Sequence, residues 1–314
     1  SPSLTRFDTH WRVPVYLSIL LVTCSVLNIT LYHTLIELYA ITIAIMSYVV
    51  AYNTYSFSKN KFILFLGCGY FWVGIVDLFH TLSFENMGVF THTSPSTSLH
   101  LWIFARYLEG LILLIAPFNF IKKLRPKYIF LGLGISSLIF LILAFQVIPT
   151  TYSLPDLYTQ NAGLSDSKIF NEYLIIAILC VASVNYAWFA KHIDKSTRNL
   201  LIVSTVLTIA AELNFTLYAN MGDIPLIIGH LFKLFSFWAI YRALIESSLT
   251  RPFTSLSKVV SSYDKVSEPT VIIDQDGVIQ NANKAVRSTK GRAVIGQHCH
   301  EVLHNAAINK QDCS

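Results

Sequence analysis

The sequence predicts an all-α polytopic membrane protein of eight transmembrane helices, with both termini in the cytoplasm, followed by a short α+β segment. Hydrophobic residues make up 54% of the 314 residues and charged residues only 13%, whereas soluble domains carry roughly 25% charged residues. Apolar runs of about 20 residues recur along the chain, and each is long enough to cross about 30 Å of hydrocarbon. Between these runs, Lys and Arg concentrate in alternate connections, a pattern that orients helices in a membrane.

Eight spans follow from the apolar runs that lie between polar flanks. They are expected at residues 13–31, 36–57, 62–81, 98–118, 128–148, 169–190, 199–220 and 225–246. No small-residue cleavage site follows the first run, so this run is expected to be a span and not a cleavable signal peptide.

The positive charges predict the orientation of the spans. They lie before the first span and in every second connection: Arg6 and Arg12, Lys59 and Lys61, KKLRPK (122–127) and KHIDKSTR (191–198). The intervening connections hold no Lys or Arg: 32–35, 82–97, 149–167 and 221–224. Basic loops stay on the cytoplasmic side, so both ends are expected there. The net charge of +5 therefore reflects membrane flanks, and we expect no nucleic-acid partner.

After the eighth span the sequence becomes polar. Residues 247–266 carry apolar side chains near helical spacing and are expected to form a helical connector. The stretch EPTVIIDQDGVIQNANKAV (268–286) is typical of strand, turn, strand and helix, with Asp276-Gly277 as the hairpin turn. Either Asn281 or Asn283 is expected to cap the helix.

Ionisable residues within the spans are expensive to bury, so they usually pair with one another or carry function. Several share a helical face with a partner three or four residues away. The set comprises His33 and Glu37, Asp77 and His80, His100, Arg106 and Glu109, Glu212, and His230 and Lys233. With the predicted orientation, all four membrane histidines fall in the outer half of the bilayer. This common depth predicts a pocket that faces the periplasm.

Imidazole and carboxylate groups together suit Zn²⁺, Cu²⁺ or Fe²⁺. His33, Glu37, His80 and His230 are therefore the candidate metal ligands. Asp77 is expected to orient one of the imidazoles. Deeper ion pairs are expected to hold the fourth, seventh and eighth helices in register; they involve Arg106, Lys233, Glu109 and Glu212. His100 is expected at the edge of the pocket. Haem is the alternative cofactor, with His80 and His230 as axial ligands.

Other interpretations of these residues stay open. A histidine near a membrane interface, such as His33 or His100, can be a wetted side chain without a ligand. Asp77 and Glu37 can serve only to neutralise Arg106 or Lys233. His92 lies in a Ser/Thr-rich loop and is expected to be solvated.

Long motifs also resemble a known family, the third type of membrane-associated sensor domain (the MASE group). They are YHTLIELYAI (32–41), VDLFHTLSFENMGVF (76–90), LWIFARYLEGLILLIAP (101–117), AELNFTLYANMGDIPLIIGHLFKLFSFWAIYRALIE (211–246) and RPF (251–253). The resemblance covers about residues 10–253. It departs from the family pattern at Asn86, which precedes Met87 where the family usually has a small residue.

The resemblance implies a multi-pass input domain in the bacterial inner membrane. Family members are usually followed by PAS domains and then by a histidine kinase or diguanylate cyclase. The segment 268–286 and Val294–Gln297 resemble the start of a PAS domain. We therefore expect a membrane sensor domain at 1–246, a connector at 247–266 and the N-terminal part of a truncated, cytoplasmic α+β PAS domain at 267–314. A whole PAS domain is longer, so the chain is expected to be cut within a longer protein.

These observations predict a sensor that is not itself an enzyme and that works as a homodimer, as PAS-linked signalling proteins do. A quinone or lipid sensor, and a transporter or membrane enzyme that uses the same histidines and carboxylates, are the competing functions. Near the C-terminus, Cys299, His304 and Cys313 are candidates for a second metal site, and ordinary PAS surface is the alternative.

Overall fold

The computed structural model describes residues 2–84, 87–90, 95–118, 123, 125–145, 154–159, 163–218 and 222–303. The chain divides into two compact units, Ser1–Leu249 and Thr250–Ser314. His92, Asn86, His304 and Cys313, which the sequence singles out, lie outside the described residues.

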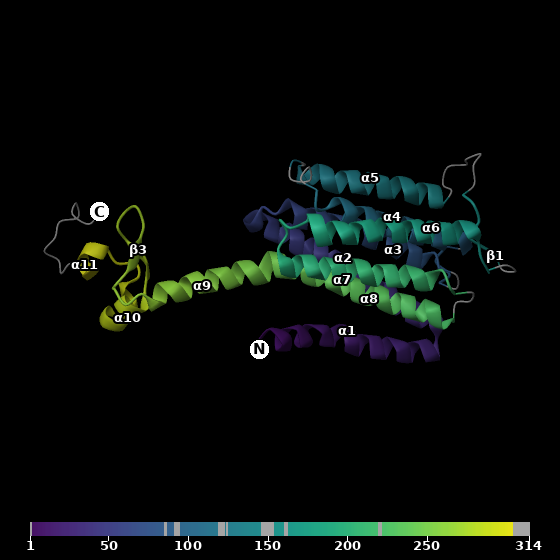
Figure 1. The fold of residues 1–314 in the computed structure, drawn as a ribbon. Helices are drawn as coiled ribbons and strands as arrows, with labels where there is room; N and C mark the ends of the chain where they lie inside the picture. Colours follow the sequence, from purple (N-terminus) through teal and green to yellow (C-terminus); the bar gives the residue numbers. More distant parts are fainter. Residues whose placement is uncertain are drawn as a thin grey trace. The chain divides into compact units, whose positions relative to one another are not determined.

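The first unit is a bundle of helices that run side by side (Figure 1). Within the described residues, eight helices are long and apolar enough to cross a membrane, as predicted. They are α1 (Pro2–Leu27), α2 (Ile29–Ser58), α3 (Lys61–Leu82), α4 (Pro95–Ile115), α5 (Pro126–Ala144), α6 (Asp166–Val184), α7 (Lys195–Phe215) and α8 (Ile224–Ile245). The cytoplasmic location of both ends stays a prediction.

The first connection differs from the prediction. A loop was expected at 32–35, but α2 already begins at Ile29, directly after Asn28. Asn28 directly follows α1, and its side chain accepts a hydrogen bond from the amide of Leu31. This one residue therefore separates the two helices and caps the N-terminus of α2. His33 consequently lies inside a helix and is buried.

Two further segments were not foreseen. Within the expected loop 149–167, β1 (Tyr158–Thr159) pairs antiparallel with β2 (Gly163–Leu164). After α6, a π-helical turn, η2 (Asn185–Phe189), precedes the short connection to α7.

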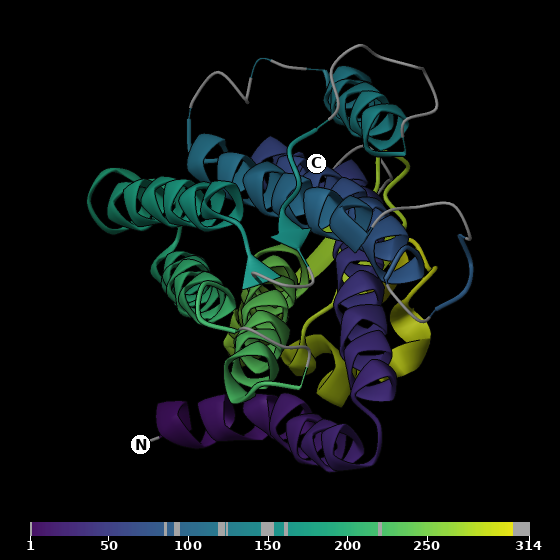
Figure 2. The same cartoon turned by 90° about the vertical axis from the view of Figure 1, so that its right-hand side faces the viewer.

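Helix α3 forms the centre of the bundle and packs against α2, α4 and α5, while α8 packs against α2 and α7. Small residues allow the closest approach, because a Cβ on Gly67 or Gly74 of α3 would overlap a methyl group of α2, that of Ala51 or Ala44. Figure 2 views the helices end-on and shows α1 at the edge of the bundle. Exposed apolar side chains on α1, such as Ile19, are consistent with a lipid-facing surface.

The second unit contains α9 (Arg251–Lys265), which follows the π-helical turn η3 (Glu246–Thr250). It also contains β3 (Val271–Ile273), β4 (Ile279–Ala282), α10 (Lys284–Lys290), η4 (Arg292–Val294) and α11 (Cys299–Leu303). The predicted strand, turn, strand and helix are thus confirmed, and β3 pairs antiparallel with β4.

Of the two candidate caps, Asn283 is the one used, since it accepts a hydrogen bond from the amide of Val286. The turn is completed by Gly277, whose φ of 78° lies in the left-handed region. Cys299 is buried in the small core of this unit with Ile279 and Val302. The assignment of the unit to the PAS fold stays a prediction.

Candidate functional site

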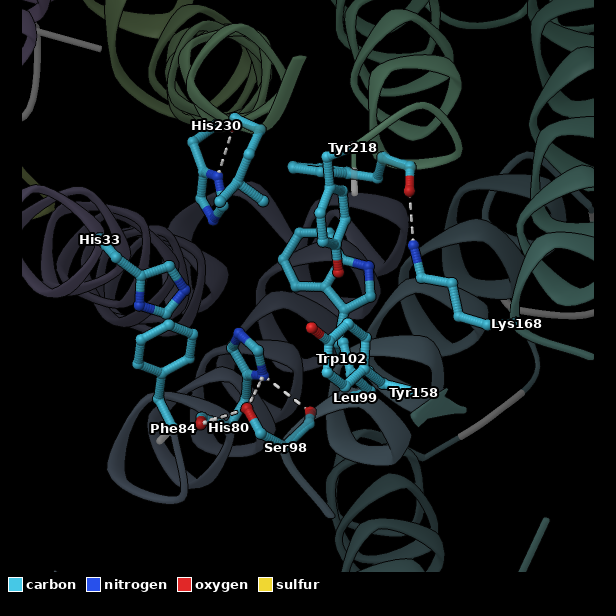
Figure 3. A pocket seen from close by; sticks show the side chains of 12 residues that line it. His33, His80, Phe84, Ser98, Leu99, Trp102, Tyr158, Lys168, Tyr218 and His230 are labelled. Carbon is cyan, nitrogen blue, oxygen red and sulfur yellow. Dashed lines mark hydrogen bonds between the residues drawn. The ribbon is translucent and has the colours of Figure 1, made fainter. Parts of the chain in front are cut away.

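A cavity lies where α3 ends and α2, α4 and α8 begin, and three of the predicted histidines face it (Figure 3). We call it the histidine cavity. It is lined by His33, His80, Phe84, Ser98, Leu99, Trp102, Tyr158, Lys168, Phe215, Tyr218, Leu226 and His230. About 40 Å³ is open to the centres of water-sized molecules, where one water needs roughly 10–15 Å³. An ion with one or two waters therefore fits.

Two of the histidines are held by backbone carbonyls. The Nδ1 atom of His80 lies 2.8 Å from the carbonyl oxygen of Ser98, and that of His230 lies 2.8 Å from the carbonyl oxygen of Leu226. Because a carbonyl oxygen only accepts, Nδ1 carries the hydrogen in each ring. When such a ring is neutral, its Nε2 atom presents a lone pair, as a ligand of a metal ion does.

The third ring, His33, lies close to both of the others. Its centroid is 5.6 Å from that of His80 and 5.0 Å from that of His230. Phe84 stacks on it with a centroid distance of 4.1 Å, which restricts the orientation of the ring. Residues from three helices thus converge although up to about 200 positions separate them in sequence.

Four buried polar atoms in this group have no hydrogen-bond partner among the described residues. They belong to the four predicted metal ligands: His33 Nδ1, Glu37 Oε1, His80 Nε2 and His230 Nε2. Buried polar atoms are nearly always satisfied, so a cluster of four unsatisfied atoms indicates a place for a ligand.

Three of these ligands come close enough to share one ion. Candidate ligand atoms of His33, Glu37 and His230 all lie within 4.8 Å of one another. Glu37 Oε1 is 3.3 Å from His230 Nε2, where two lone pairs would repel unless a cation, either a proton or a metal ion, lies between them. His80 faces the same cavity from α3, but it does not belong to the group of His33, Glu37 and His230 whose ligand atoms lie within 4.8 Å of one another.

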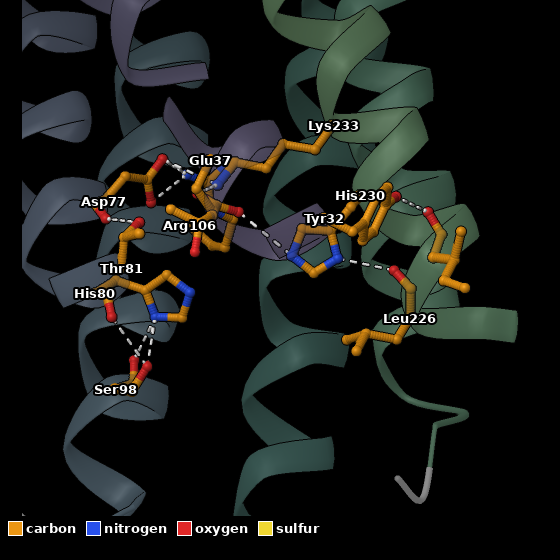
Figure 4. A network of polar contacts seen from close by, with 12 residues as sticks. Tyr32, Glu37, Asp77, His80, Thr81, Ser98, Arg106, Leu226, His230 and Lys233 are labelled. Atoms are coloured by element: carbon orange, nitrogen blue, oxygen red, sulfur yellow. Dashed lines mark hydrogen bonds and ion pairs between the residues drawn. The ribbon is translucent and has the colours of Figure 1, made fainter. Parts of the chain in front are cut away.

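Next to the histidines, buried charges form what we call the ion-pair chain (Figure 4). Lys233 Nζ lies 2.6 Å from Glu37 Oε2 and 3.1 Å from Asp77 Oδ2. Arg106 pairs with the same Asp77 oxygen at 2.8 Å and also pairs with Glu109. Three carboxylates therefore face two permanent cations. The remaining negative charge favours one more cation in the neighbouring cavity.

The ion-pair chain corrects two expectations. Asp77 does not orient an imidazole; it pairs with Lys233 and Arg106, and the His80 ring is oriented by Ser98. The ion-pair chain also joins α2, α3, α4 and α8, whereas the expected ion pairs joined the fourth, seventh and eighth helices. The reason is that Asp77, one turn before His80 on α3, points between Arg106 and Lys233 (Figure 4).

Two predicted residues lie elsewhere. His100 is at the start of α4, where its Nε2 lies 3.0 Å from the carbonyl oxygen of Pro155; it does not line the histidine cavity. Glu212 is buried on α7 and lies against Glu172 of α6.

The sequence interpretation missed Lys168 and Glu172. Lys168 lines the histidine cavity, and its Nζ lies 2.7 Å from Glu172 Oε1. The available signal was a Lys and a Glu four residues apart at the start of an apolar run, which places them on one helical face.

The packing around the histidines argues against haem. Two axial imidazoles would need a flat macrocycle between them. The ring of Trp102 already lies 5.4 Å from His80 and 6.0 Å from His230, and His33 lies within 5.6 Å of both. Closely packed rings therefore surround both imidazoles in this arrangement.

Comparison with known proteins agrees with the architecture. Residues 24–252 match the family model MASE3, described as a membrane-associated sensor domain. No curated protein and no solved structure matches the chain.

Proposed function

The chain belongs to the MASE3 family of membrane-associated sensor domains, and we propose that it detects a divalent transition-metal ion in the histidine cavity. A sensor domain is not itself catalytic. We further propose that it lies in a bacterial inner membrane with the cavity toward the periplasm, and that it controls a histidine kinase or diguanylate cyclase beyond a PAS domain. The charge distribution of the loops and the order of the elements support this arrangement.

The observation that carries the metal proposal is the convergence of His33, Glu37 and His230, whose candidate ligand atoms lie within 4.8 Å of one another. The unpartnered Nε2 atom of His80 belongs to the lining of the same cavity. This donor set suits Zn²⁺, Cu²⁺ and Fe²⁺. His80 and His230 present the correct nitrogen because backbone carbonyls hold the other one. The uncompensated negative charge of the ion-pair chain adds attraction for a cation.

Binding would be coupled to the bundle through Glu37. A metal ion on Glu37 Oε1 competes with the Lys233 ammonium on Oε2 for the same carboxylate. Lys233 belongs to α8, which is followed by the π-helical turn η3 and then by α9. A signal needs a difference in metal affinity between two arrangements of the bundle. The two arrangements would be one in which Lys233 pairs with Glu37 and one in which Lys233 turns toward Asp77, and the metal ion would favour the second.

We also propose that the chain acts as a homodimer through α9. Phe253, Leu256, Val260 and Tyr263 follow one another at spacings of three, four and three residues. The first three are largely exposed, and none of the residues of α9 is buried. This spacing is that of the a and d positions of a two-stranded coiled coil, so a second copy of the same helix is the expected partner.

The proposed function is tested on the full chain purified in detergent, by elemental analysis and an absorption spectrum. We expect about one Zn²⁺ per chain after incubation with zinc and dialysis, and strongly reduced retention in His80→Ala and His230→Ala. His100→Ala is the matched control, because this histidine does not line the cavity, and it should retain zinc. Retention unchanged in both cavity variants, or none in the wild type, overturns the proposal; a Soret band would indicate haem instead.

A further inference from the structure

A second buried polar cluster begins at Lys168, on the side of the histidine cavity opposite His33 (Figure 3). It consists of Lys168 and Glu172 on α6 and Glu212 on α7, each no more than 1% exposed. Lys168 Nζ donates to the carbonyl oxygen of Phe215 at 2.6 Å and pairs with Glu172 Oε1 at 2.7 Å. Lys168 also lines the histidine cavity (Figure 3), so one side chain links the cavity to the carboxyl groups.

The carboxyl groups of Glu172 and Glu212 lie against each other; we call them the acid pair. None of their four oxygens accepts a hydrogen bond of normal geometry from a described donor. Two adjacent carboxylates repel strongly in a region of low dielectric. One shared proton removes the repulsion and supplies the donor that these oxygens lack.

The charges that face the acid pair support the presence of one shared proton. Lys168 is the only cation paired with it among the described contacts. Arg106 on α4 is attracted to Glu212 but pairs with Asp77 and Glu109. One ammonium and two carboxylates leave one negative charge, which is costly to bury within a membrane span.

Neighbouring hydroxyl groups do not replace the proton. Tyr107 of α4 faces Glu172 but donates its hydrogen to Asn171 Oδ1 at 2.8 Å. Tyr218, which follows α7, presents its ring to Lys168, with Nζ 5.0 Å from the ring centroid. A hard metal ion is also disfavoured, because such ions take about six oxygens, and the described contacts here offer the two carboxyl groups and a carbonyl that Lys168 already uses.

We infer that Glu172 and Glu212 share one proton and form a proton-binding site within the membrane, which communicates with the histidine cavity through Lys168. The domain then holds two cation sites on opposite sides of one cavity, one for a metal ion and one for a proton. The inference does not depend on the identity of the metal. Proton occupancy would be a second signal for the domain, because loss of the proton leaves two adjacent carboxylates and, among the described contacts, one paired cation, Lys168.

Infrared spectroscopy of the full chain in detergent tests the acid pair directly. A protonated carboxylic acid has a carbonyl stretch that a carboxylate lacks, and the band shifts in D₂O. We expect this band in the wild type at neutral pH. It should disappear in Glu212→Gln and in Glu172→Gln, because each variant removes one acid and leaves the other to pair with Lys168 as a carboxylate.

Glu109→Gln is the matched control, since Glu109 is buried but pairs with Arg106, and the band should persist there. Absence of the band from the wild type overturns the inference without any variant, and so does its persistence in both acid-pair variants. A band that appears only after sodium is removed would show a metal cation in place of the proton. Zinc retention is measured on the same samples, so failure of the metal proposal is recorded separately.

Discussion

Lys233 Nζ lies 2.6 Å from Glu37 Oε2, which places an ammonium on the carboxylate that also faces His230. Both side chains are buried, so neither is screened by water and their attraction is strong. Lys233 therefore pairs with the carboxylate that a metal ion in the cavity would also use. The affinity of the histidine cavity for a metal ion is therefore set by competition as well as by its ligands.

Replacing Lys233 should strengthen metal binding. In Lys233→Gln the competing charge is gone, and we expect the affinity for Zn²⁺ to rise at least about tenfold, since even a partly screened charge at this range contributes more than 1 kcal/mol. Titration against a zinc chelator measures the change. Lys191→Gln, an exposed position between α6 and α7, is the control and should leave the affinity unchanged. Weaker zinc binding in Lys233→Gln would show that Lys233 positions Glu37 and does not compete for it.

Arg106 should be essential for stability. Its guanidinium joins Asp77 to Glu109, and all three side chains are buried. Arg106→Gln removes the ion-pair partner of Glu109 and one of the two cations paired with Asp77, and breaking such a buried pair costs about 3–5 kcal/mol. Thermal unfolding in detergent measures this loss. The double variant Arg106→Gln/Glu109→Gln should lose less than the two single variants together; simple additivity would show that Arg106 and Glu109 do not stabilise each other.

The number of membrane helices was predictable because length and hydropathy are local properties of the chain. The break between α1 and α2 was not, because Asn28 alone ends one helix and caps the next. The polar residues Tyr32 and His33 resembled a loop flank, although both are buried in α2.

The candidate ligands were also partly predictable. Helical spacing places His33 and Glu37 on one face, and the common depth of the histidines indicated a shared pocket. The partners of Asp77 were not predictable, because they depend on how α3, α4 and α8 are rotated about their axes. Lys168 was not considered, because the sixth span was expected to begin at residue 169, whereas α6 begins at Asp166.

Close packing of α2 on α3 predicts a suppressor pair. In Gly67→Ala the new methyl group would overlap Cβ of Ala51, and such overpacking costs about 1–3 kcal/mol. Ala51→Gly removes the obstructing group, so the double variant should recover most of the lost thermal stability. Gly132→Ala on α5, with nothing within 4 Å of the added Cβ, is the control and should be neutral or slightly stabilising. Equal effects at both glycines would contradict the role of Gly67 in the approach of α2 to α3.

The turn between β3 and β4 should depend on the charge of Asp274. Its carboxylate accepts hydrogen bonds from the amides of Val278 and Asp276 and from the side chain of Gln280. The Val278 amide is the main reason why the pKa of Asp274 lies below its ordinary value of 3.8. A carboxyl group with a lowered pKa stabilises the turn above the unfolded-state pKa, and this contribution disappears as the pH falls through the folded-state value.

We therefore expect Asp274→Asn to expose the amide of Val278 at neutral pH and to lessen the effect of acidification below pH 3.8. Hydrogen exchange of the peptide that covers β3 and β4, corrected for the intrinsic effect of pH, measures both. Asp276→Asn removes the same charge from the same turn and serves as the control. A similar change in exchange in both variants would attribute the effect to net charge and not to the hydrogen bonds of Asp274.

The proposed dimer predicts which positions on α9 can be cross-linked. Leu256 is a d position of the three–four–three spacing and Lys258 is an f position, so only the first should face its own copy in a parallel pair. With the native cysteines replaced, Leu256→Cys should form a disulfide-linked dimer in membranes under mild oxidation, because d positions of a coiled coil approach within disulfide range. Lys258→Cys should stay largely monomeric. Equal cross-linking at the two positions would indicate random collision, and none at Leu256→Cys would assign the exposed apolar face of α9 to a different partner.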